Sequence, residues 1–180
     1  MGLAFNVVPS GTEENGGNGT TPAQKVQDWA VDKAMAVARM HPSSWIVAAD
    51  TIVVLDGEIF GKPADPAAAA AMLERLSGRS HEVISGLCLA HAAKDFWRVE
   101  AIRTLVRFKQ LSAGEIDAYL ETGEPFDKAG AYGIQGLGAF FVEAVYGSYT
   151  NVVGLPLCEV LDWLLAEQVI RVGEPDGGRR

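Results

Sequence analysis

Cysteine is scarce in this sequence: Cys88 and Cys158 are the only two among 180 residues. Two isolated cysteines provide neither a metal-ligand spacing nor a disulfide framework. Long hydrophobic runs are also missing, since no apolar stretch approaches the roughly 20 residues that a membrane span needs. The chain does not open on the basic and then apolar segment of a secretory signal peptide. We therefore expect no membrane association and a location in the reducing cytoplasm.

Positive charge is in short supply as well. Fifteen Lys and Arg residues stand against 23 Asp and Glu residues, which gives a net charge of −8 and a pI near 4.8. A nucleic-acid-binding surface needs a basic patch, so we expect no nucleic-acid partner. An acidic protein that handled a polyphosphate would have to gather its few cations in one place or recruit a metal ion. Lysines and carboxylates in unusual positions are therefore the residues to look for.

Hydrophobic residues make up 48% of the chain, enough for a core. Four stretches have the pattern of helices. The first begins at Pro22 behind the N-cap Thr21, the second at Asp65-Pro66, the third at the capping box Ser112–Glu115, and the last after Leu155-Pro156. The first helix is expected to end at His41-Pro42 and the second at Gly78, because proline and glycine terminate helices.

Five stretches are expected to be strands: residues 3–8, 45–55, 81–92, 96–108 and 138–145. The second has the continuous apolar, β-branched pattern of a strand buried on both faces. Asp56-Gly57 predicts a hairpin turn after it. Helices and strands alternate at first, and strands follow one another in mid-chain. This order predicts an α/β fold with a mixed twisted sheet and flanking helices, as one domain of residues 1–172, with a disordered tail at 173–180.

Asp50 breaks the pattern of its strand, because apolar residues continue for several positions on both sides of it. A buried carboxylate costs several kcal/mol unless it is paired or bound to a metal. The alternative is a residue at the end of a strand that caps a turn. The length of the apolar run favours a functional carboxylate.

Two lysines also occupy unusual places. Lys33 projects from the apolar stripe of the first helix, between Trp29 and Val37. It either snorkels to water or directs its ammonium group into a cleft. Lys62 lies between Gly61 and Pro63, in a stiff turn that suits the presentation of a point charge, although turn lysines are usually just solvated.

Two loops complete the candidate site. Glu13-Glu14 lies in a Gly- and Asn-rich loop, where a carboxylate is either a hard oxygen ligand for Mg²⁺ or ordinary surface. Residues 127–136 mix glycines with Lys128, Tyr132 and Gln135; glycines let a backbone approach a ligand, and a Gln amide can pair with the edge of a base. The same composition also fits a tight loop without a ligand. Two lysines, two carboxylates and this loop together suit Mg²⁺-assisted attack of water on a polyphosphate.

Taken together, these segments resemble the Maf family of nucleotide pyrophosphatases, first associated with septum formation. The matching stretches are residues 8–14, 30–34, 49–54, 61–63, 76–83, 123–125, 127–136 and 151–157, which occur in order over nearly the whole chain. The resemblance implies a mixed sheet like that of inosine-triphosphate pyrophosphatases, with two lobes around a cleft. It also implies hydrolysis of a nucleoside triphosphate to its monophosphate and pyrophosphate, with Mg²⁺ or Mn²⁺, and allows a homodimer.

The resemblance also implies roles for single residues. Asp50 is similar to the family's catalytic acid, which binds the metal or activates water, and Glu14 matches an acidic position of the site. Lys33 and Lys62 match the lysines that hold the phosphates, and Lys128 belongs to the substrate-binding loop. Thr51 and Gln135 match positions tied to base selection in the branch that acts on dTTP and UTP, so we expect these two substrates.

One family segment has no counterpart here. Family members open with a strand and a Ser-x-Ser-Pro-Arg-Arg turn that grips the phosphates, whereas the first arginine of this chain is Arg39. The resemblance therefore implies an N-terminally shortened member. The alternative function is a nucleotide-binding or septum-associated regulator with impaired catalysis.

Overall fold

The computed structural model describes residues 3–12 and 20–171. Its helices and strands, in chain order, are α1 (Pro22–Met40), β1 (Ile46–Leu55), β2 (Glu58–Phe60), α2 (Pro66–Leu76), β3 (Ser80–His91), η1 (Ala92–Lys94), β4 (Phe96–Phe108), α3 (Ala113–Glu121), η2 (Glu124–Asp127), η3 (Ala129–Ala131), η4 (Leu137–Phe141), β5 (Val142–Tyr146), α4 (Tyr149–Val153) and α5 (Leu157–Ala166). The predictions for Glu13, Glu14 and the tail 173–180 lie outside the described residues. Among the described helices, none is long and apolar enough to cross a membrane.

The strands form one sheet in the order β2-β1-β3-β4-β5. The predicted α/β class, with a sheet flanked by helices, is confirmed. Within the described residues the four strand pairs are all antiparallel, so the mixed pairing that we expected is not found there. Two of these pairs are hairpins: the turn at Asp56-Gly57 returns β1 directly into β2, and the single turn η1 returns β3 into β4.

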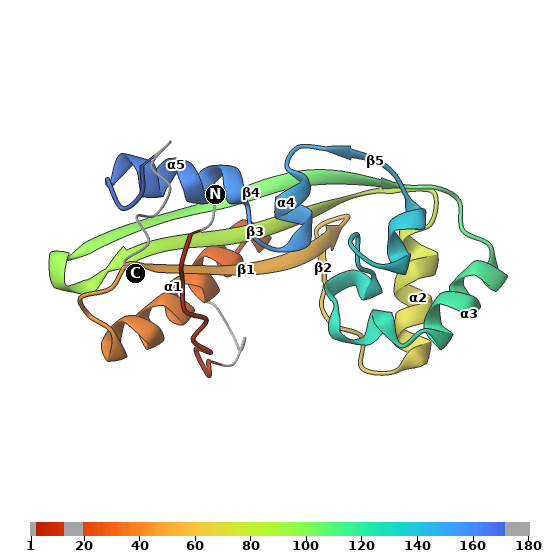
Figure 1. Ribbon diagram of the computed structural model, residues 1–180. Coiled ribbons are helices and arrows are strands. Elements are labelled where there is room, and N and C mark those ends of the chain that lie inside the picture. Colours follow the sequence, from red (N-terminus) through yellow and green to blue (C-terminus); the bar gives the residue numbers. More distant parts are fainter. Residues whose placement is uncertain (1–2, 13–19, 172–180) are drawn as a thin grey trace, which may run out of the picture.

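Helices cover both faces of this sheet (Figure 1). Helix α1 lies on one face, α4 and α5 lie on the other, and α2 and α3 with η2–η4 gather at one end as a second lobe. Side chains of β1 alternate between the faces: Ile52 and Val54 pack with Val26 of α1, whereas Val53 and Leu55 belong to the core of the second lobe.

The predicted helix starts are confirmed in detail. The Thr21 side chain accepts a hydrogen bond from the backbone N–H of Gln24, and the Gln24 side chain bonds back to the backbone of Thr21. Ser112 and Glu115 form the same reciprocal box at α3, and Asp65 caps α2 through the N–H of Ala68. Each cap satisfies backbone N–H groups that have no partner inside the helix.

Two predicted strands are wrong in whole or in part. Residues 3–8 are irregular, and Phe5 and Val7 are 80% and 83% exposed, because within the described residues no strand pairs with them. Residues 137–141 form η4 instead of a strand, because the backbone N–H groups of Leu137 and Gly138 donate to Glu124. The strand β5 therefore begins only at Val142. The short helix α4, with Ser148 as its N-cap, was not predicted.

Candidate functional site

Asp50 and Lys33 form an ion pair between β1 and α1. The Lys33 ammonium donates to the Asp50 carboxylate, and the two side chains are 21% and 6% exposed. The prediction that Asp50 is buried is confirmed, and the cost of burying it is offset by the opposite charge. An ammonium beside a carboxylate favours the ionised form of that carboxylate, which is the form that can accept a proton.

The sheet register explains why these two residues meet. Asp50 lies opposite Gly86 of β3, and Ala48 lies opposite Cys88. Ala48 and Cys88 pack against the small residues Ala30 and Ala34 of α1. Because the residues at this interface are small, α1 lies close to the sheet and the Lys33 side chain can reach the strand beneath it.

Thr51 faces the opposite side of the sheet. Its hydroxyl lies 2.7 Å from the Ser85 hydroxyl and donates to the carbonyl oxygen of Gly154 at 3.3 Å. Consecutive strand residues point to opposite faces, so Asp50 is turned toward α1 and Thr51 toward α4. A ligand that contacted both would have to lie across the edge of β1.

A cavity of about 1900 Å³ lies beside the first part of β1. Residues 3–8, residues 46–49 and α5 contribute apolar walls, and Lys33 and Arg171 are basic residues of the lining. The register of β1 with β2 covers only Val53–Leu55 on that side of the strand. The cavity therefore gives the Lys33 side of the ion pair a space large enough for a small molecule.

Lys62 and the glycine-rich loop lie together, next to the end of β1. The N–H of Gly130 donates to the carbonyl oxygen of Gly61 at 3.1 Å, and a Cβ placed on Gly130 would meet Val53 at 3.0 Å. Lys128 donates to Asp127 at 2.6 Å. This hydrogen bond, with the charges of Lys128 and of the nearby Lys62, lowers the pKa of Asp127.

The structure thus brings the predicted residues together in two groups. Asp50, Lys33 and Thr51 lie at β1, and Lys62 and Lys128 lie at the turn after β2 and in the loop beside it. Gln135 is an exposed residue of the same glycine-rich segment. Glu14 lies outside the described residues.

The sequence analysis assigned no role to two polar residues that the structure shows to be buried or half-buried, Asn151 and Glu124. Asn151 is fully buried, and its amide nitrogen donates to the carbonyl oxygens of Val83 and Ile102 and to Thr104. The backbone carbonyl oxygen of Asn151 accepts from the Ser85 hydroxyl, which also lies next to the Thr51 hydroxyl. The only signal for Asn151 was its place in the stretch 151–157.

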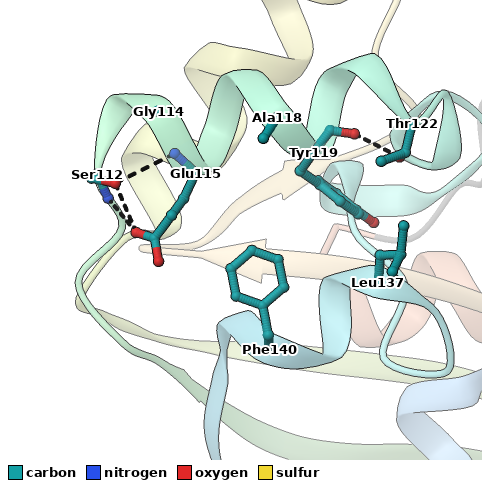
Figure 2. A pocket seen from close by; sticks show the side chains of 8 residues that line it. All are labelled: Ser112, Gly114, Glu115, Ala118, Tyr119, Thr122, Leu137 and Phe140. Carbon is teal, nitrogen blue, oxygen red and sulfur yellow. Dashed lines mark hydrogen bonds between the residues drawn. The ribbon is translucent and has the colours of Figure 1, made fainter.

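Glu124 is the second such residue. Its carboxylate accepts hydrogen bonds from Tyr119, Leu137 and Gly138. The sequence signal was the stretch 123–125, to which no role was assigned. A smaller cavity of about 410 Å³ lies between α3 and η4, with Tyr119, Leu137 and Phe140 in its wall (Figure 2).

The metal ligands that we expected were Asp50 and Glu14. Within residues 3–12 and 20–171, no group of three or more His, Cys, Asp or Glu side chains is arranged to hold a metal ion. Asp50 already bonds to Lys33. The described residues therefore supply one of the two expected ligands and do not form a metal site by themselves.

The molecule is thus an α/β protein with a buried carboxylate–ammonium pair beside a cavity and with Lys62 and Lys128 near its glycine-rich segment. Comparison with known proteins identifies the family of this chain. The family model described as "Maf-like protein" matches residues 1–167, and the chain belongs to this family.

Individual relatives match over most of their length. A protein of Syntrophus aciditrophicus is 44% identical over 164 residues, which are 91% of this chain and 80% of the relative. One of Geobacter metallireducens is 52% identical over 161 residues, covering 89% and 84%. One of Desulfotalea psychrophila is 45% identical over 172 residues, covering 96% and 88%. All three are named dTTP/UTP pyrophosphatase.

Proposed function

We propose that this protein hydrolyses dTTP and UTP to the nucleoside monophosphate and pyrophosphate. The observation that carries the proposal is the Asp50–Lys33 pair, which places a buried carboxylate next to an ammonium group beside the cavity along β1. The names of the relatives support the reaction and the two substrates.

In the proposed reaction, Asp50 orients a water molecule and takes its proton. The water oxygen bonds to the phosphorus atom nearest the nucleoside, the anhydride bond to the next phosphate breaks, and pyrophosphate leaves. Lys33 donates hydrogen bonds to the phosphate oxygens, on which negative charge develops. Lys62 and Lys128 bind the outer phosphates from the turn and the glycine-rich loop.

A divalent cation, Mg²⁺ or Mn²⁺, is part of the proposal, with Asp50 and Glu14 as its protein ligands. Mg²⁺ is usually held by one or two carboxylates together with substrate phosphates, so a cluster of three protein ligands is not required. When bound, the cation would neutralise phosphate charge. Removal of divalent ions with a chelator should abolish turnover, and addition of Mg²⁺ should restore it.

Base selection is assigned to Thr51 and Gln135. The Thr51 hydroxyl is held in place by Ser85 and Gly154, and the Gln135 amide can offer both a donor and an acceptor to a pyrimidine edge. We also propose a cytoplasmic location and a homodimer. Light scattering of the purified chain tests the dimer.

The test of the function is pyrophosphate release from dTTP, UTP, CTP and GTP by the wild-type chain and by Asp50→Asn. The wild type should prefer dTTP and UTP, and Asp50→Asn should lose about 100-fold or more in kcat, as expected for a general base. Asp117→Asn is the matched control, because Asp117 is an exposed residue of α3.

Retained turnover in Asp50→Asn would exclude the role of Asp50. Binding of UTP by the wild type without release of pyrophosphate would exclude the enzymatic function and favour the regulator.

A further inference from the structure

We propose that Glu124 is a positioning residue, which fixes the backbone of residues 133–138 and thereby sets the orientation of Gln135 for base selection. The inference rests on the proposed function, because base selection has a meaning only if the protein acts on nucleotides. The fixing of the backbone itself is a separate, measurable part of it.

The contacts of Glu124 hold this segment after Gln135. One carboxylate oxygen accepts from the Leu137 N–H at 2.8 Å, and the other accepts from the Gly138 N–H at 3.2 Å. The second oxygen also accepts from the Tyr119 hydroxyl at 2.8 Å.

Tyr119 binds the backbone of the same segment on the other side of Gln135, at Gly133. Its hydroxyl oxygen accepts from the N–H of Gly133 at 3.1 Å while its hydrogen goes to Glu124. Figure 2 shows the Tyr119 ring reaching from α3 toward Leu137. The carboxylate and the phenol thus bind backbone N–H groups on both sides of Gln135, which is itself exposed.

The glycines of this segment show how closely the backbone approaches the carboxylate. A Cβ on Gly136 would lie 2.3 Å from both oxygens of Glu124, and one on Gly138 would lie 2.7 Å from the Tyr119 hydroxyl. A Cβ on Gly133 would lie 3.1 Å from Glu124 and closer still to the Lys128 side chain. Glycine at these positions therefore lets the backbone come close enough for the N–H groups of Gly133 and Gly138 to donate to Tyr119 and Glu124.

The electrostatics favour an ionised Glu124 that is turned inward. Burial alone would raise its pKa, but hydrogen bonds from the Leu137 and Gly138 N–H groups and from Tyr119, with the charge of Lys128, lower the pKa overall. Hydrogen bonds to an ionised acceptor are the stronger kind. Both oxygens of Glu124 accept hydrogen bonds from this segment, and one also accepts from Tyr119, which suits a residue that holds the loop in place.

The neighbouring residues fix Glu124 itself. Gly123 has a φ of 75°, which starts the turn, and Pro125 is buried after it. Lys128 donates to the backbone carbonyl oxygen of Glu124 at 3.2 Å. This accounts for the stretch Gly123-Glu124-Pro125 as a rigid support for the segment that carries Gln135.

The experiment compares the wild type, Glu124→Gln, Gln135→Ala and the double variant. In Glu124→Gln an amide replaces one acceptor oxygen, so one backbone N–H loses its bond. We expect kcat/KM for dTTP and UTP relative to CTP to fall about 10-fold, within the range of about 100-fold that misplacement of a binding group can cost. In the Gln135→Ala background the same change should have almost no further effect on this ratio.

Amide hydrogen exchange provides a readout that does not depend on catalysis. Glu124→Gln should lose protection at residues 133–138 while β3 keeps its protection. Tyr119→Phe keeps the carboxylate and should lose protection at the same residues, but to a smaller extent. It replaces Glu124→Gln as the test variant if Glu124→Gln does not fold. Glu121→Gln, at an exposed glutamate of α3, is the matched control.

The outcomes are distinguishable. A wild type without turnover of dTTP and UTP rejects the proposed function, whereas an active wild type whose selectivity survives Glu124→Gln rejects the inference. Unchanged exchange at residues 133–138 also rejects it. Equal loss for every nucleotide, additive with Gln135→Ala, would show a purely structural Glu124.

Discussion

A Cβ atom placed on Gly86 of β3 would lie 1.9 Å from the backbone carbonyl oxygen of Val26 in α1. The helix therefore rests directly on the backbone of the sheet at this point. Asp50 lies opposite Gly86 in the register, and Lys33 lies about two turns further along the same helix. This close approach is what brings Lys33 and Asp50 together.

Gly86→Ala should displace α1 from the sheet. Overpacking of a close interface costs about 1–3 kcal/mol, and we expect the free energy of unfolding to fall by that amount, with loss of turnover as Lys33 moves. Urea unfolding and pyrophosphate release measure the two effects. Gly114→Ala is the control: a Cβ there meets nothing within 4 Å, and it lies in α3, so stability should stay equal or rise. Equal behaviour of the two variants would contradict the prediction.

The Lys33–Asp50 pair should contribute measurably to stability. Lys33→Met keeps most of the side-chain volume and removes a charged hydrogen bond to a buried carboxylate, which is worth about 1.5–3 kcal/mol. We expect a loss toward the lower value, since the Lys33 side chain is 21% exposed. In an Asp50→Asn background the same change should cost clearly less. If Lys33→Met lowers the free energy of unfolding by the same amount in both backgrounds, the two residues do not stabilise the fold through their interaction.

Stability should fall as the pH drops from about 6.5 to about 4 because of His81. Burial lowers the pKa of His81 from the ordinary 6.5 to about 4, and its ring bonds to the Tyr132 hydroxyl at 2.8 Å. In this range the unfolded chain binds a proton that the folded chain does not, so stability rises with pH. The full effect is about 3 kcal/mol.

Urea unfolding at pH 7.5, 6 and 5 measures the His81 effect. His81→Gln stays uncharged in both states and should show a shallower slope than the wild type over this range. Carboxylates that titrate in the same window affect both proteins equally and cancel in the comparison. Identical slopes would show that His81 is not responsible.

Asn151→Leu should destabilise the protein through lost hydrogen bonds. The substitution removes the hydrogen bonds from the Asn151 amide to the carbonyl oxygens of Val83 and Ile102 and to Thr104, and an intramolecular hydrogen bond contributes about 0.5–1.5 kcal/mol. Thermal unfolding checks this. Gln110→Leu, at an exposed amide with one side-chain hydrogen bond, to the half-buried hydroxyl of Ser77, should have a clearly smaller effect. A melting temperature unchanged by Asn151→Leu would exclude the role.

The sequence predicted the features that short-range chemistry determines. Helix starts follow from capping residues such as Thr21 and Ser112, the hairpin follows from Asp56-Gly57, and the burial of Asp50 follows from the apolar run around it. These signals lie within a few residues of the element that they specify.

The features that depend on distant partners were missed. Residues 3–8 have the composition of a strand, but a strand also needs a neighbour to bond to. Residues 137–141 turn into η4 because of Glu124, more than a helical turn away in sequence, and nothing in their own composition reveals it. The opposite directions of Asp50 and Thr51 follow from the alternation of a strand, and their assignment to one site, which the resemblance implies, stays a prediction.

Strands β3 and β4 run without a break through both lobes. Val83 and Val106 belong to the core of the second lobe, and Leu87 and Ile102 belong to the core beneath α5. The two cores thus share the same covalent backbone and the same hydrogen-bond ladder, so one lobe cannot swing on a flexible linker or melt while the other stays intact. Heat should therefore unfold both lobes in one cooperative transition.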